Sequence, residues 1–314
     1  MRSNLYDHEC QDSEGGEADL HKMFAGCQKN PGHRQFIPID TLTIKHLPEI
    51  HRNKDLYALI KAVADLTVRV DVNMVSHRRP EVWPQSNRLY PFYNLSRSSN
   101  MRTGSGMIRS AFKCPDDSTI PTSKCWCRKC EHSDSASNAW WEFYVDTATH
   151  LVFDDIEARH TSLRLFYDRA DSPAVFVNKV KVARANVEDD RCLLKCVTCD
   201  DILGEMLERK WNHYIQVWTN VKDVYQSSRD SHKLMFIVSH PHGCLKQVSI
   251  GQWKDKILNK ADDKVSRFTY KTSTCPGSSG AVVNCVGFRI WWSDLVHSGS
   301  LKSGLNYSGA GFVI

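Results

Sequence analysis

The sequence predicts an all-β fold, and three observations support this. After residue 101, β-branched and aromatic residues occur in short runs separated by Gly, Pro, Asp and Ser, as in β-sandwiches and barrels. The 314 residues are 41% hydrophobic and 25% charged, which is ordinary for a globular chain of about two domains. No apolar run approaches the roughly 18 residues that span a bilayer, which argues against a membrane-embedded protein.

The net charge bears on possible partners, and the first residues of the chain bear on the cellular compartment. The chain has 41 Lys and Arg against 36 Asp and Glu, a net charge of +5 without long single-sign blocks, so nucleic acid is not indicated as a partner. The first residues contain no apolar signal-peptide core. We therefore expect an intracellular protein, cytoplasmic or nuclear, whose 12 cysteines are thiols, metal ligands or nucleophiles rather than disulfides.

Two regions are expected. Residues 1–100 form an N-terminal extension: residues 1–45 are predicted to be disordered, a helix begins after Asn53 and ends near Val70, and residues 79–100 form a Pro-rich loop. Residues 101–314 form the β region, with a Cys-rich insertion at about 114–139. One helix interrupts this region, capped by Asp200 or Asp201 and reaching Trp211.

The expected strands follow the apolar runs in chain order. They cover residues 140–145, 162–167, 174–182, 193–197, 234–238, 246–250, 281–286 and 288–296.

Three short segments carry the chemistry. Ser279 lies between glycines just before a β run, where a tight turn can expose a nucleophilic hydroxyl to converging backbone N–H groups. His150 ends an apolar strand, as a general base could. Asp190 directly precedes another strand and could orient a histidine. Taken singly, these residues could also be a Ser/Gly turn, a hydrogen-bonded core histidine and a solvated acidic turn.

Together, in the order His, Asp, Ser, these segments resemble the trypsin-like serine peptidases of the chymotrypsin fold. The similarity covers residues 101–314 and includes a first strand like the G-S-G-F-I of the intracellular and bacterial branches. The segments that carry it are Thr103-Gly104-Ser105-Gly106-Met107-Ile108, Thr147-Ala148-Thr149-His150, Asp190-Arg191-Cys192-Leu193-Leu194-Lys195 and Cys275-Pro276-Gly277-Ser278-Ser279-Gly280.

The resemblance implies two packed antiparallel β-barrels with the active site between them. It also implies that Ser279 is the nucleophile, His150 the general base and Asp190 its orienting carboxylate, with the backbone N–H groups of Gly277 and Ser279 as the oxyanion hole. The expected activity is that of a serine endopeptidase that acts on proteins or peptides through an acyl-enzyme and needs no catalytic cofactor. The alternative is an inactive peptidase-like module that binds peptides.

The sequence departs from the family's pattern beside the nucleophile and the base. Ser278 replaces the usual acidic residue, and no R-I-V-G-G sequence precedes the domain, so activation by a freed N-terminus is not expected. Leu151 replaces the cysteine that usually follows the base, which agrees with a reducing compartment.

The expected specificity pocket contains Ser273, Thr274 and His297. The resemblance places Ser273 at the pocket base, where a carboxylate would favour Arg or Lys, so tryptic cleavage is not expected. An uncharged Ser there is compatible with large apolar side chains. Thr274 and His297 together resemble the pair with which glutamyl endopeptidases and viral main proteases hold Glu or Gln, the alternative that we favour; His297 could also be an ordinary strand residue.

The insertion contains Cys114, Cys125, Cys127 and Cys130 within a short stretch. Soft ligands at this density could bind a tetrahedral structural zinc, but the sequence favours free thiols on a surface insertion, because C-x-C-x-x-C lacks the paired C-x-x-C motifs of strong zinc signatures. For Cys192, Cys196 and Cys199, positions along a strand favour core thiols, and His240 and His242 are interpreted as part of a turn.

Overall fold

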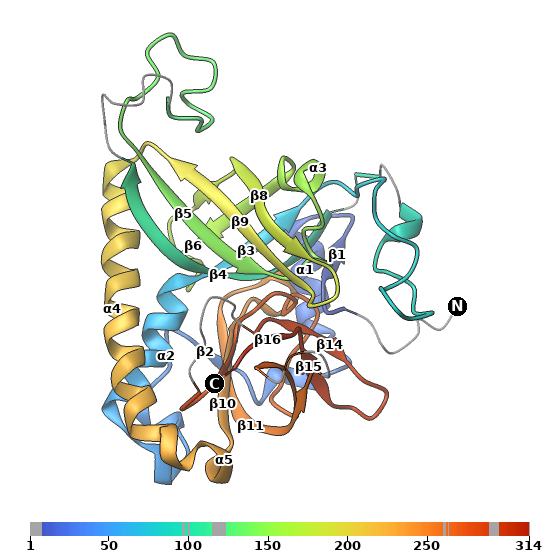
Figure 1. Cartoon of the computed structure of the whole chain (residues 1–314), viewed down its shortest axis with the longest axis vertical. Helices are drawn as coiled ribbons and strands as arrows, with labels where there is room; N and C mark the ends of the chain where they lie inside the picture. Colours follow the sequence, from blue (N-terminus) through green and yellow to red (C-terminus); the bar gives the residue numbers. More distant parts are fainter. Residues whose placement is uncertain are drawn as a thin grey trace.

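The computed structural model describes residues 8–95, 98–99, 101–114, 124–259, 262, 264–288 and 295–313. Two curled antiparallel sheets, one above the other in Figure 1, make up most of this part of the chain. The prediction of an all-β, chymotrypsin-like double barrel is confirmed.

The first sheet has the strand order β7-β6-β3-β4-β5-β9-β8, with β1 paired to β4. In β6, Thr161, Leu163 and Leu165 are buried while the residues between them are half-buried, the period of two that one covered face of a sheet requires. The strands are β1 (Gln11–Ser13), β3 (Thr67–Val72), β4 (Met101–Cys114), β5 (Trp140–Thr147), β6 (Thr161–Leu165), β7 (Val175–Val177), β8 (Val180–Asn186) and β9 (Arg191–Thr198).

The second sheet has the order β13-β10-β11-β12-β15-β14, with β16 paired to β12 and β2 paired to β11. A separate apolar core fills it, in which Trp253, Phe268 and Phe288 meet edge to face. The strands are β2 (Ile37–Pro38), β10 (Leu234–Ser239), β11 (Gln247–Leu258), β12 (Val265–Tyr270), β13 (Val283–Cys285), β14 (His297–Ser300), β15 (Asn306–Ser308) and β16 (Gly311–Phe312).

The helices are mostly peripheral. α4 (Asp201–Tyr225) runs beside both sheets with α2 (Lys54–Leu66) next to it, and the Asp200 side chain caps α4 by accepting the Leu203 N–H at 3.0 Å (Figure 1). The remaining helices are α1 (Glu17–Ala25), α3 (Asp155–Ala158), α5 (Arg229–His232) and the 3-10 turns η1 (Pro31–His33), η2 (Ile44–His46), η3 (Glu49–His51), η4 (Tyr93–Leu95), η5 (Gln226–Ser228) and η6 (Pro241–Gly243). Among the described residues, no helix combines the length and apolar character needed to cross a membrane.

The N-terminal residues differ from our expectation. Within residues 1–45, predicted to be disordered, the part from His8 onward contains β1, α1 and β2, because short apolar side chains such as Leu20 and Phe36 are buried against the second half of the chain. The predicted helix ends at Leu66 rather than near Val70, and β3 follows directly, between β6 and β4. Residues 1–100 thus supply a central strand of the first sheet.

Most expected strands occur, with shifted ends, and the helix predicted to reach Trp211 continues to Tyr225 because its apolar face extends through Val217 and Val221. Residues 289–294 of the strand expected over 288–296, and residues 115–123 of the insertion, lie outside the described part.

Candidate active site

The three residues expected to act together lie in one chain of hydrogen bonds. His150 Nε2 is 2.7 Å from Ser279 Oγ, and His150 Nδ1 is 2.9 and 2.8 Å from the two carboxylate oxygens of Asp190. All three side chains are buried. Asp190 also accepts a hydrogen bond from the His150 backbone N–H at 3.1 Å and one from Ser298 Oγ. Asp189, the neighbouring carboxylate, instead accepts a hydrogen bond from the Asn186 amide.

Local structure fixes each member of this triad. His150 follows the end of β5, and Asp190 lies in the β8–β9 turn with a φ of 53°, a left-handed conformation that Asp tolerates better than most residues. Ser279 lies in the loop between β12 and β13. From β4, Ser105 holds that loop through its N–H to Ser279 O and its Oγ to Gly277 O, both at 2.8 Å. The first sheet therefore positions the Ser279 loop of the second.

A buried charge network supports the His150 turn. Glu157 accepts hydrogen bonds from Arg79 and Arg102, and all three side chains are excluded from solvent. Arg79 also donates to His150 O at 3.0 Å, and Arg102 to Leu151 O at 3.0 Å. The network therefore holds the backbone that carries the histidine.

Burial and charge compete at His150. Burial disfavours the imidazolium, but the Asp190 carboxylate outweighs burial and raises the pKa of His150 to about 10. A base held this way accepts a proton from a serine more readily than a free imidazole does.

An N-terminal segment of this chain threads the site like a substrate. The Glu9 carbonyl oxygen accepts the backbone N–H groups of Gly277 at 2.5 Å and Ser279 at 3.2 Å, the two donors expected to form the oxyanion hole. His8, just upstream, pairs antiparallel with Gly299 in β14. Downstream, β1 continues by pairing antiparallel with β4.

The Glu9 side chain fills the pocket beside Ser279. Its carboxylate is 2.8 Å from His297 Nε2, accepts Ser300 Oγ at 2.7 Å and forms an ion pair with Lys29. Burial opposes ionisation, but Lys29 and His297 hold the pKa of Glu9 below its usual range. Burial lowers the pKa of His297, which favours the neutral ring. Its Nε2 donates to the ionised Glu9 carboxylate, which leaves Nδ1 to accept a hydrogen bond from the Tyr270 hydroxyl at 2.6 Å.

The other two residues expected in the pocket, Thr274 and Ser273, form hydrogen bonds to other residues rather than to Glu9. Thr274 accepts a hydrogen bond from Lys29 Nζ at 3.0 Å, so it helps to position the cation. Ser273 donates to Gln35 and is not in contact with the carboxylate. Sequence reasoning did not identify Glu9, Lys29 or Ser298, because no motif links the first thirty residues to β14.

The Cys-rich insertion forms a four-thiol cluster that differs in one member from the expected set. Cys125, Cys127 and Cys130 meet Cys199 at the end of β9, with all four sulfurs within 4.8 Å of one another. Cys114 packs against the cluster without joining it, because β4 and β5 hold it at the base of the insertion. Cys192 and Cys196 are buried in the core of the first sheet, as predicted. The prediction of a third core thiol at Cys199 is wrong, because Cys199 follows the end of β9 and is half-buried in the four-thiol cluster.

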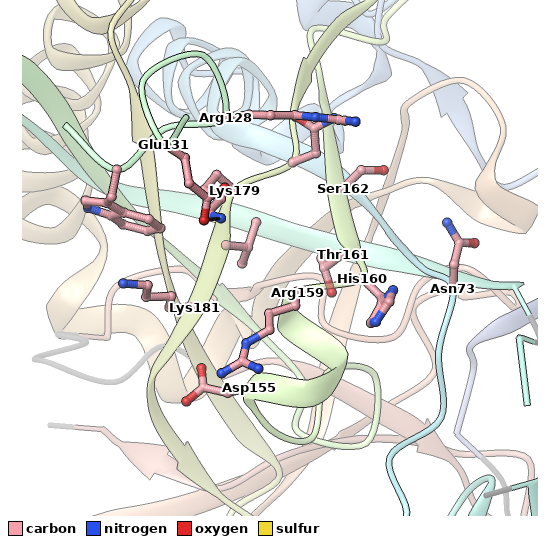
Figure 2. A pocket seen from close by; sticks show the side chains of 13 residues that line it. Asn73, Arg128, Glu131, Asp155, Arg159, His160, Thr161, Ser162, Lys179 and Lys181 are labelled. Carbon is pink, nitrogen blue, oxygen red and sulfur yellow. Dashed lines mark hydrogen bonds and ion pairs between the residues drawn. The ribbon is translucent and has the colours of Figure 1, made fainter. Parts of the chain in front are cut away.

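A large cavity lies away from His150, Asp190 and Ser279. Figure 2 shows several charged side chains around it, and two of these cations have partners within the wall. Lys179 forms an ion pair with Glu131, and the Lys181 ammonium lies over the Trp126 ring. None of the triad residues lines it; labelled around it are Asn73, Arg128, Glu131, Asp155, Arg159, His160, Thr161, Ser162, Lys179 and Lys181.

No protein-family profile and no curated protein matches the sequence. Among solved structures, the chain is similar to an HtrA-type protease AlgW with tripeptide, at 11% identity and a TM-score of 0.40 over 80% of this chain and 58% of that chain. It is also similar to the Rv3671c protease in its inactive form, at 10% identity and a TM-score of 0.40 over 84% and 90%. A thermostable serine protease AL20 from an extremophilic microorganism matches at 9% identity and a TM-score of 0.37 over 80% and 92%.

The two curled antiparallel sheets give the chain a chymotrypsin-like double barrel, and the solved structures that it resembles are proteases. It spans less than two thirds of the length of the AlgW chain.

Proposed function

We propose that the chain is a serine endopeptidase that hydrolyses peptide bonds through Ser279, His150 and Asp190. The hydrogen-bonded chain from Ser279 Oγ through both ring nitrogens of His150 to Asp190 carries this proposal. His150 takes the proton as Ser279 attacks a carbonyl carbon, and Asp190 holds the histidine tautomer and stabilises its cation. The Gly277 and Ser279 N–H groups stabilise the oxyanion that develops.

The resulting acyl-enzyme is hydrolysed by water, with His150 acting again as base and no catalytic cofactor. Gly277 suits its task because its φ of 96° is in the region that favours glycine, and a Cβ there would lie 2.3 Å from His240 O. Only glycine can present the first oxyanion donor in this way.

We propose that this enzyme cleaves after glutamate, one of the alternatives left open for the pocket beside glutamine and large apolar side chains. A neutral His297 donates one hydrogen bond, which either Glu or Gln could accept. Lys29 adds a full positive charge beside Thr274, Ser300 and Asn306, and a hydrogen bond to a charged group contributes about 1.5–3 kcal/mol. The cation therefore favours glutamate over glutamine, and an ammonium facing the pocket disfavours the apolar side chains of Phe and Leu, which cannot pair with it.

A fluorophosphonate probe separates this proposal from the alternative of an inactive peptide-binding module, because an activated serine attacks electrophiles that ordinary serines ignore. The full chain and its Glu9→Ala variant, whose pocket lacks the carboxylate, are labelled and the adduct is mapped by mass spectrometry. We expect labelling of Ser279 that is lost in Ser279→Ala and kept in Ser231→Ala, which changes an exposed serine. No adduct in either chain would refute the peptidase proposal.

We further propose a structural zinc in the insertion, held by Cys125, Cys127, Cys130 and Cys199. Cys127 Sγ and Cys199 Sγ are 3.4 Å apart, close to the roughly 3.8 Å between two sulfurs of a tetrahedral Zn site with about 2.3 Å bonds. The ion would clamp the loop onto the end of β9. Native mass spectrometry of the full chain tests this: Cys127→Ser should lose one zinc, whereas Cys285→Ser, a buried thiol outside the cluster, should not.

A further inference from the structure

The peptide bond between Glu9 and Cys10 lies where the scissile bond of a substrate would lie. The Glu9 carbonyl oxygen faces both oxyanion donors, and its side chain fills the pocket. Beyond the carbonyl, the Cys10 sulfur and a ring nitrogen of His150 are within 4.8 Å of each other, and the Cys10 N–H donates to His8 Nδ1 at 3.3 Å. A general acid beside the leaving amine is what breakage of the Glu9–Cys10 bond requires.

Both sides of this bond are held in extended backbone. Upstream, His8 pairs with Gly299, and its ring packs 4.6 Å from Phe92 and 5.7 Å from His150. Downstream, Gln11 pairs with Thr103 in the register of β1 on β4. An antiparallel strand on each side of the carbonyl would hold an extended peptide in the same way, so the segment lies as a substrate would lie.

We propose, building on the proposed function, that the enzyme cleaves its own Glu9–Cys10 bond intramolecularly. Ser279 Oγ bonds to the Glu9 carbonyl carbon and its proton passes to His150. The C–N bond then breaks, and the Cys10 nitrogen leaves as an amine with that proton. Water hydrolyses the ester, releasing the first nine residues with a Glu9 carboxylate and restoring Ser279. Cleavage opens the site to other substrates.

Intact mass spectrometry of freshly purified full chain tests this. We expect loss of residues 1–9 and a new N-terminal Cys10 in the wild type, and an uncut chain in Ser279→Ala. Glu9→Gln, which loses the charge facing Lys29, should slow cleavage about 10- to 100-fold, whereas Glu14→Gln, an exposed carboxylate nearby, should not.

The dependence of cleavage on protein concentration distinguishes cleavage within one chain from cleavage of one chain by another. The cleaved fraction should follow the same time course over a hundredfold range of concentration, and Ser279→Ala chains mixed with wild type should stay intact, because their own site shields the bond. Cleavage of these chains would overturn the intramolecular route. A wild type that stays uncut while Ser279 labels and external Glu peptides are hydrolysed would overturn self-cleavage and leave the proposed function standing.

A different observation carries a second inference, in the wall behind the nucleophile loop. Cys27, His33, His242 and Cys275, all buried, bring one ligand atom each within 4.8 Å of one another. Cys275 Sγ is 3.5 Å from Cys27 Sγ and 3.5 Å from His33 Nε2. Two thiolates and two imidazoles at these separations match a tetrahedral zinc site.

The surroundings of this cluster favour a metal. His242 Nδ1 donates to Gln11 Oε1 at 2.7 Å, which leaves Nε2 as a bare, buried acceptor without a partner among the described residues. The Asn30 backbone N–H points to Cys27 Sγ at 3.4 Å, and its side-chain amide to Cys275 Sγ at 3.1 Å. Both histidines have positive φ, 47° for His33 and 53° for His242, a strain that a functional site explains.

We infer that these four residues bind a second zinc ion, which joins the N-terminal segment to the loop four residues before Ser279. Native mass spectrometry of the full chain should find two zinc ions. Cys27→Ser and His33→Ala should each lose one, and His46→Ala, an exposed histidine, none. If these variants do not fold, X-ray absorption of the wild type decides: a mean of three sulfur and one nitrogen ligands per zinc supports both sites. Four sulfur ligands with one zinc would overturn this inference.

Discussion

Glu157→Gln should destabilise the protein more than most single substitutions, because Glu157 is the one carboxylate between two fully buried arginines. Its oxygens accept Arg79 Nε and Nη2 at 2.6 and 2.8 Å, Arg102 Nη2 at 2.7 Å, Ser76 N at 2.9 Å and Phe153 N at 2.8 Å. An amide has one acceptor oxygen, so at least two of these donors would face an NH₂ group. The two guanidinium groups would also lose their buried counter-charge.

Removing one partner of a buried ion pair costs about 3–5 kcal/mol, a large part of the about 5–15 kcal/mol that stabilises a folded domain. Urea unfolding followed by Trp fluorescence measures this loss directly, with Glu205→Gln on the exposed face of α4 as the matched control. A loss below about 1 kcal/mol would mean that the arginines find other partners, and the role of this network in holding the His150 turn would be refuted.

Three further substitutions test the site itself, each assayed with external Glu peptides. Asp190→Asn should lower kcat about 10⁴-fold. Asp190 raises the pKa of His150, and the base must be neutral to act, so wild-type activity should rise with pH well above 6.5. In the variant, the acid limb of the pH–rate profile should move to lower pH. An unchanged limb would contradict this. Lys29→Met should lower kcat/KM for Glu peptides about 10- to 100-fold and leave Gln peptides nearly unchanged; equal losses would mean that Lys29 only supports the fold. Gly277→Ala should lower kcat about 10²- to 10³-fold with a normal circular dichroism spectrum, and full activity would refute its place in the oxyanion hole.

The fold class and the three proposed catalytic residues could be predicted because their signals are local. His150, Asp190 and Ser279 each end or begin a β run, and a strand register fixes which neighbour faces inward, so Asp190 rather than Asp189 points to the base. β3 could also have been predicted from the sequence. Val68, Val70 and Val72 alternate as in a strand, but the helical spacing just before them obscured this pattern.

The pocket and the two proposed zinc sites could not be predicted in full because their members come from distant segments. Glu9 and Lys29 meet His297 only when the amino-terminal segment lies in the cleft. Cys199 joins the insertion through the pairing of β5 with β9, and no spacing rule links Cys27 to Cys275. Tertiary contact, rather than residue type, selects these partners.

The position of β3 inside the first sheet limits where this chain can be divided for fusion to another protein. Val70 faces Gly104 of β4 on one side and Leu163 of β6 on the other, so a fragment that begins at residue 101 leaves both neighbours with open hydrogen-bonding edges. Exposed edges pair with other chains and promote aggregation. The same fragment lacks Arg79, which leaves part of Glu157 unpaired. Gene fusion or domain shuffling at that boundary would transfer the three proposed catalytic residues without an intact first sheet, so a functional transfer has to include the first hundred residues.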